Sequence, residues 1–193
     1  MAPLLFSTIE VTAQAFYRTS LSYAIVNLKP IVPGHVLVIP TRPVQRIADL
    51  EDNELVSLIR SVRRVGNVVQ RVYGADALTI ACQDGPAAGQ SVPHVHFHIL
   101  PRKAQGDRFS EDKDAIYPEL ETGEASLMSE LHEHNEAQKP AKQQQLHKHQ
   151  PFKVDADEDR KPRSMEEMVK EAAWLKGFFM ESEESKDLQD QVD

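Results

Sequence analysis

The stretch Val92-Pro93-His94-Val95-His96-Phe97-His98-Ile99-Leu100 places three histidines at alternate positions. Side chains on a β-strand point to opposite faces with a period of two, so a strand here would put all three imidazoles on one face. Val95, Phe97 and Ile99 would then fill the other face. The pattern therefore predicts a strand with one polar, reactive face and one core face.

Two kinds of site could use such a row of imidazoles. One is a metal site, because alternate imidazoles on a strand can converge on zinc. The other is suggested by the preceding segment, Gln83-Asp84-Gly85-Pro86-Ala87-Ala88-Gly89-Gln90-Ser91. Its glycines permit left-handed backbone, and such a loop can turn successive N–H groups inward to bind an anion. An ordinary turn between two strands is the alternative interpretation of this loop.

The string from Gln83 to Arg102 resembles the signature of the histidine-triad family of nucleotide hydrolases and transferases. Within that family the chain is most similar to the fragile-histidine-triad branch, the diadenosine triphosphate hydrolases. The likeness continues in residues 21–27 and 33–38 and reappears in residues 163–168. Leu100-Pro101-Arg102 follows the triad where the nucleoside phosphoramidase branch typically has a glycine pair.

The resemblance implies nucleotidyl transfer through a covalent intermediate. His96 would attack the α-phosphorus of diadenosine triphosphate, expel ADP and hold AMP until water releases it. A neutral imidazole is nucleophilic near neutral pH, which suits this role. His94 and His35 are expected to orient the nucleophilic ring through hydrogen bonds, although His35 could equally be a structural core histidine.

The resemblance also implies how the substrate is bound. The amides of residues 89–92, together with His98, would neutralise the phosphate oxygens. Gln90 would in addition donate near the bridging oxygen and the departing group, so it counts among the catalytic residues. Mg²⁺ or Mn²⁺ would be carried mainly by the substrate phosphates, with no metal ligand from the protein. The expected substrate-binding residues are Asn27, Gln83, Gly89, Gln90, Ser91, Val92 and His98.

Two other functions could use the same site. One is a nucleoside phosphoramidase or dinucleotide phosphorylase. The other is a non-catalytic nucleotide sensor, in which the bound complex is the signal.

The composition fits a soluble enzyme. The chain has 193 residues, 40% of them hydrophobic, which suits one domain with additional polar sequence. The single cysteine, Cys82, excludes an intrachain disulfide. We find neither a run approaching 18 apolar residues nor a secretory signal. We therefore expect a cytoplasmic location, with the nucleus as a further one, and no membrane partner.

The net charge of −8 is unevenly distributed. Residues 1–110 hold 11 basic and 8 acidic side chains, whereas residues 111–193 hold 11 and 22. A mildly positive body can accept a polyphosphate but lacks the basic excess of a nucleic-acid-binding protein.

Hydrophobic periodicity predicts an α+β domain over residues 1–121, with an antiparallel sheet of about five strands and one long helix over 54–73. The strands are expected at 4–7, 15–19, 22–28, 36–40, 78–82 and 94–101. The family resemblance adds that two subunits join their sheets in a homodimer.

The C-terminal third is predicted to divide into three parts. Residues 122–161 are rich in polar side chains and should form an insertion that is disordered or at most weakly helical. Ser164 and Glu167 make a capping box, so residues 162–181 should contain a helix that packs on the catalytic domain. Residues 182–193 are expected to be a mobile acidic tail.

Overall fold

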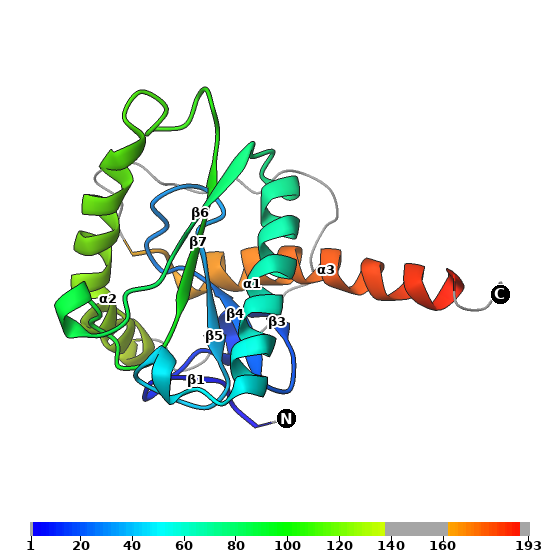
Figure 1. The fold of residues 1–193 in the computed structure, drawn as a ribbon, viewed down its shortest axis with the longest axis horizontal. Helices are drawn as coiled ribbons and strands as arrows, with labels where there is room; N and C mark the ends of the chain where they lie inside the picture. The colour runs from blue at the N-terminus through cyan, green and yellow to red at the C-terminus, as the bar shows by residue number, and fades with distance from the viewer. Residues whose placement is uncertain (1, 138–161, 190–193) are drawn as a thin grey trace.

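The computed structural model describes residues 2–137 and 162–189 (Figure 1). A five-stranded sheet of order β3-β4-β5-β7-β6 forms its centre, and every neighbouring pair is antiparallel. These strands are β3 (Ala15–Arg18), β4 (Ser22–Val26), β5 (Val36–Pro40), β6 (Ala77–Ala81) and β7 (Phe97–Arg102). The predicted α+β class with an antiparallel sheet is confirmed. The predicted strand at 4–7 belongs instead to a separate hairpin of β1 (Leu5–Phe6) and β2 (Ile9–Glu10).

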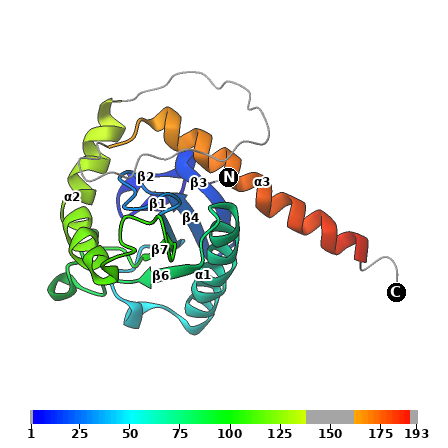
Figure 2. The same ribbon diagram turned by 90° about the horizontal axis from the view of Figure 1, so that it is seen from above.

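Three long helices surround the sheet: α1 (Asp52–Val72), α2 (Ile116–Ala137) and α3 (Met165–Gln189). Figure 2 shows α1 and α2 on opposite sides of the sheet. Short 3₁₀ turns lie at Thr12–Gln14, Ile47–Asp49, Pro86–Ala88 and Lys113–Ala115. Among the described residues, none of the helices combines the length and apolar character that crossing a membrane would need.

The helix predicted at 54–73 is α1. A capping box begins it, in which Glu51 and Glu54 each accept a hydrogen bond from the other's backbone N–H. The apolar stripe of α1 packs on the sheet and is fully buried at Leu58 and Val65. Burial of this stripe, rather than intrinsic propensity, is the main source of stability for such a helix.

Helix α2 corrects the prediction for residues 122–161. Its N-terminal part lies in the expected catalytic domain, and it continues through the expected boundary to Ala137. The physical reason is a stripe of buried apolar side chains that recurs at helical spacing, Ile116, Leu120, Leu127 and Leu131. Residues 138–161 lie outside the described part of the chain.

Helix α3 begins at the predicted capping box. The Ser164 N–H donates to Glu167 Oε2 over 2.8 Å, and the Glu167 N–H donates to Ser164 Oγ over 3.3 Å. The predicted mobile tail from 182 is wrong as far as Gln189, because the helix continues to that residue. The sequence from 181 to 189 holds no glycine or proline that would end a helix.

Candidate active site

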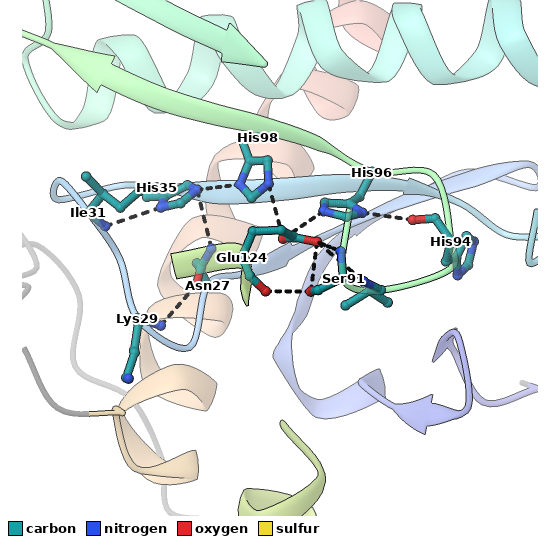
Figure 3. Close-up of polar contacts among 10 residues, drawn as sticks. Asn27, Lys29, Ile31, His35, Ser91, His94, His96, His98 and Glu124 are labelled. Atoms are coloured by element: carbon teal, nitrogen blue, oxygen red, sulfur yellow. Dashed lines mark hydrogen bonds and ion pairs between the residues drawn. The ribbon is translucent and has the colours of Figure 1, made fainter. Parts of the chain in front are cut away.

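The predicted strand at 94–101 begins later than expected, at Phe97. Pro93 has no N–H to give to a ladder, and the His94 N–H donates back to the Val92 carbonyl over 2.7 Å. This tight turn keeps His94 out of the strand. His96 and His98 nevertheless direct their Nε2 atoms to the same place, the carboxylate of Glu124 on α2 (Figure 3).

Both ring nitrogens of His94 are bonded within the protein. Nδ1 accepts from the Ser7 N–H over 3.0 Å, so the proton is on Nε2, which donates to the Pro40 carbonyl over 2.9 Å. Burial lowers the pKa of His94 to about 4. The three imidazoles therefore do not converge on one metal ion, and the zinc triad considered from the sequence is not formed.

His96 is oriented by the backbone of His94 rather than by its imidazole. Its Nδ1–H donates to the His94 carbonyl over 2.8 Å, and the Phe6 ring packs nearly perpendicular to it at a centroid distance of 5.1 Å. Nε2 is thus the nitrogen directed into the site. It lies 3.2 Å from Glu124 Oε2, and a hydrogen bond there needs one proton between the two groups.

His35 acts on His98, not on His96 as predicted. The Ile31 N–H donates to His35 Nδ1 over 3.2 Å, so the ring proton of neutral His35 is on Nε2. This Nε2–H donates to His98 Nδ1 over 2.9 Å. His98 must then carry its proton on Nε2, and burial lowers its pKa, which favours this neutral form.

The Nε2–H of His98 is buried, and within the described residues it has no acceptor at hydrogen-bonding distance. The Glu124 carboxylate is 3.7 Å away. The hydrogen bonds from Ile31 to His35 and from His35 to His98 therefore leave the Nε2–H of His98 available to donate to an anion beside His96 Nε2.

The loop before the triad supplies fewer amides than expected. The Gly89 N–H donates to the Pro86 carbonyl over 3.0 Å and the Gln90 N–H to the Gly85 carbonyl over 3.2 Å, which closes the turn itself. Only the amides of Ser91 and Val92 point at the anion position, where they lie 3.0 and 3.4 Å from Glu124 Oε1. Of the amides of residues 89–92 that were predicted to bind the anion, only the last two are thus directed at it.

Gly89 serves the turn through its conformation. Its φ is +90°, and a Cβ at this position would lie 2.7 Å from the side-chain nitrogen of Gln83. The Gln83 amide packs against the turn, and its Oε1 is buried without a partner among the described residues. Gln83 is therefore held beside the loop.

Gln90 and Asn27 lie at the two flanks of the site. The Gln90 Nε2–H donates to the Gln45 carbonyl over 3.0 Å, and its Oε1 is a second buried oxygen with no partner in the described range. Asn27 Oδ1 accepts from the Lys29 N–H over 2.9 Å, and its amide nitrogen is 3.3 Å from His35 Nε2. The structure thus brings Asn27 to the His35–His98 pair.

Glu124 is the site residue that sequence reasoning missed. Burial alone would raise its pKa, but the hydrogen bond with His96 and the nearby Nε2–H of His98 outweigh burial and hold the pKa far below its usual range. The signal was present in the sequence, because Glu124 is the one acidic position within the apolar stripe formed by Ile116, Leu120, Leu127 and Leu131. It was hidden because the surrounding segment is polar in composition.

His96, His98 and Glu124 also form the one group of potential metal ligands found within the described residues, with ligand atoms within 4.8 Å of one another. Two imidazole nitrogens and one carboxylate suit zinc better than Mg²⁺, which prefers oxygen ligands and retains several waters. The chain's own residues therefore do not fit a Mg²⁺ site here.

The space at the site is small. A cavity of about 10 Å³ lies beside His35, His98 and Glu124, whereas ligand pockets for small molecules measure roughly 300–1,000 Å³. A larger groove, about 1,020 Å³, lies along α1 beside Tyr17 and Phe178. The cavity between α2 and His98 is thus too small for a nucleotide.

Comparison with known proteins identifies the family. A HIT domain family model matches residues 8–105. A bis(5'-nucleosyl)-tetraphosphatase [asymmetrical] of Schizosaccharomyces pombe is 51% identical over 94% of this chain and 97% of its own length. The bifunctional bis(5'-adenosyl)-triphosphatase/adenylylsulfatase FHIT of Arabidopsis thaliana is 43% identical over 86% of this chain and 78% of its own.

Two solved structures share the fold. The C. elegans NitFhit protein is 38% identical with a TM-score of 0.53, over 65% of this chain and 30% of that longer one. The diadenosine triphosphate hydrolase of Plasmodium falciparum is 29% identical with a TM-score of 0.53, over 63% of this chain and 84% of its own. The chain therefore belongs to the HIT domain family.

Proposed function

We propose that the chain is a dinucleoside polyphosphate hydrolase that cleaves diadenosine triphosphate to AMP and ADP through a nucleotidyl intermediate on His96. The observation that carries this proposal is the orientation of His96. Its Nδ1–H is bonded to the His94 carbonyl, so Nε2 points to the position that the Ser91 and Val92 amides and His98 surround. A nucleophile next to preorganised anion donors is what phosphoryl-type transfer requires.

In the first step, His96 Nε2 forms a bond to the α-phosphorus while the bond from that phosphorus to the bridging oxygen breaks, and ADP departs. In the second step, a water oxygen bonds to the phosphorus, the bond to Nε2 breaks, and AMP leaves while one proton of the water is released to solvent. The Nε2–H of His98 and the two loop amides would donate to the phosphate oxygens in both steps. The covalent intermediate divides one difficult displacement into two easier ones.

The relatives support this substrate class and add a second candidate. Several, including one from Dictyostelium discoideum at 38% identity, are bis(5'-adenosyl)-triphosphatases. The relative at 51% identity is a tetraphosphatase of the asymmetrical type. Diadenosine tetraphosphate, cleaved at the same α-phosphorus, is therefore the alternative substrate.

Mg²⁺ or Mn²⁺ would accompany the substrate phosphates, because the buried nitrogen-rich cluster at His96 is a poor site for such ions. We also propose a homodimer and a cytoplasmic location, with the nucleus as a further one. None of the residue roles proposed for the transfer steps depends on these three points.

The test is rapid mixing of the protein with diadenosine triphosphate, followed by mass spectrometry of the peptide that contains His96. We expect an added adenylate on that peptide, and AMP and ADP as the products. His96→Asn should abolish both the adduct and turnover. Turnover that survives this substitution would refute the assignment, and phosphorolysis or phosphoramidate cleavage would appear as different products. A protein that binds the nucleotide without any turnover would be a sensor.

A further inference from the structure

Helix α2 places a carboxylate where the proposed reaction needs a phosphate. Glu124 Oε1 accepts from the Ser91 amide over 3.0 Å and is 3.4 Å from the Val92 amide, while Oε2 is 3.2 Å from His96 Nε2 (Figure 3). These donors and this nucleophile are the groups that would hold and attack the α-phosphate. One set of donors cannot serve two anions, so Glu124 and substrate exclude each other.

We propose that Glu124 is an internal ligand of the anion site, and that α2 is a self-inhibiting helix which a substrate phosphate must displace. This inference rests on the proposed function, because it takes the same groups to be the phosphate-binding ones. It adds a regulatory element to that function, encoded within the chain.

The burial of Glu124 supports a specific docking of α2. The residue is 1% exposed and lies in the stripe that contains Leu120 and Leu127. A charged group buried among apolar side chains is unfavourable unless it is paired and hydrogen-bonded. At Glu124 the hydrogen bonds and charges that offset the cost of burial come entirely from the histidines and the loop of the site. The position of this carboxylate on α2 therefore fits the donors of the site.

Opening requires more than a side-chain rotation. Ser91 Oγ also donates to the main-chain carbonyl of Glu124 over 2.5 Å, so the loop is bonded to the backbone of α2. The remaining cavity is far smaller than a nucleotide. The helix itself must therefore move for diadenosine triphosphate to reach His96.

The outer contacts of α2 are compatible with such movement. Lys29 pairs with Glu130, and Arg108 with Glu119 over 2.7 Å, both at partly exposed positions where ion pairs contribute little. Gly123 lies inside the helix directly before Glu124, and an interior glycine weakens a helix at that point. The hydrogen bonds of Glu124 are thus a principal attachment of α2 to the site.

The first experiment compares Glu124→Gln with Glu121→Gln in the full-length protein. Glu121 is exposed, three residues earlier on the same helix, and serves as the matched charge control. Loss of the internal anion should lower the KM for diadenosine triphosphate and the Kd for AMP roughly tenfold, without reducing kcat, because a larger fraction of molecules is open. Glu121→Gln should leave both constants unchanged. Equal constants in the two variants would overturn the proposal.

The second experiment needs no variant, so it stands even if Glu124→Gln does not fold. Hydrogen exchange of the wild-type protein is measured with and without saturating AMP. We expect AMP to speed exchange of the backbone amides of 116–137 while exchange in β7 slows. Unchanged or slower exchange in α2 would contradict displacement. Stoichiometric zinc by elemental analysis would also overturn the proposal, since Glu124 would then be a metal ligand.

These outcomes separate this inference from the proposed function. If Glu124→Gln binds AMP more tightly but neither protein hydrolyses the dinucleotide, the function fails and the internal ligand stands. If both hydrolyse it with the same KM and AMP affinity, the function stands and the internal ligand fails.

Discussion

At the scale of single residues, backbone N–H groups determine which ring nitrogen carries the proton in two histidines of the site. The N–H groups of Ser7 and Ile31 occupy one nitrogen each of His94 and His35, which forces the proton of each ring onto Nε2. Ser7 adopts a left-handed φ of +55° to do this, an uncommon conformation for a residue other than glycine. The two rings therefore donate in fixed directions, His94 to the sheet and His35 to His98.

The arrangement at His94 predicts a pH-dependent stability. The unfolded chain would take up a proton on this side chain near pH 6.5, whereas burial lowers the native pKa to about 4. The native state is therefore favoured at neutral pH, and this advantage of about 3 kcal/mol is lost as the pH falls from about 6.5 to about 4. Urea unfolding of the wild type and of His94→Asn between pH 4 and 7 measures the difference in stability.

The two unfolding curves should approach each other as the pH falls, because only the wild type loses the contribution of a neutral His94. Curves that stay parallel over this range would mean that the native state binds a proton on His94 as readily as the unfolded chain. The comparison of two proteins removes the titration of the carboxylates, which both share.

At the scale of elements, sequence periodicity was informative wherever local pattern and burial agree. The α1 helix, the core strands and the capping box at Ser164 follow directly from spacing and side-chain chemistry. Helix α2 did not follow, because its polar composition masked four apolar positions whose burial depends on tertiary contacts, including contacts of α2 with the distant strand β2. The hydrogen-bond partner of His35 also depends on tertiary structure, because the pairing of β5 with β7 sets Leu37 opposite His98 and so brings His35 beside His98.

Helix α3 is linked to the site by a buried ion pair, and this link predicts a coupling energy. The Arg163 guanidinium donates to both the Glu171 carboxylate and the Asn27 carbonyl, and Tyr73 donates to Glu171 over 2.5 Å. Removal of one partner leaves a buried charge, so Arg163→Met should lower the free energy of unfolding by about 3–5 kcal/mol. Chemical denaturation measures this loss.

The matched test is the double variant Arg163→Met with Glu171→Met. Its loss of stability should be well below the sum of the two single losses, since no charge remains unpaired. Additive losses would show that the pair is not coupled and that α3 is held by its apolar contacts, such as Met168 and Leu175, alone.

At the scale of the whole molecule, the two long helices on opposite sides of the sheet have different tasks. Helix α1 packs its buried apolar residues into the core, whereas α2 contacts His96 and His98 through Glu124. The sheet itself ends at β6, whose outer edge pairs with no further strand in the described part of the chain. An open edge with a large exposed apolar side chain is a natural place for a second copy to add its own strand.

Ile80 provides the test of that assembly. It is 48% exposed on β6, whereas Ile59 is 47% exposed on α1 and so lies on a helix rather than on the edge strand. If two copies join through β6, the wild type should sediment as a dimer, and Ile80→Lys should shift it to the monomer because two like charges would meet across the two-fold axis. Ile59→Lys changes the same side chain at the same exposure and should remain dimeric. A monomeric wild type, or equal behaviour of the two variants in sedimentation velocity, would exclude the β6 edge as the interface.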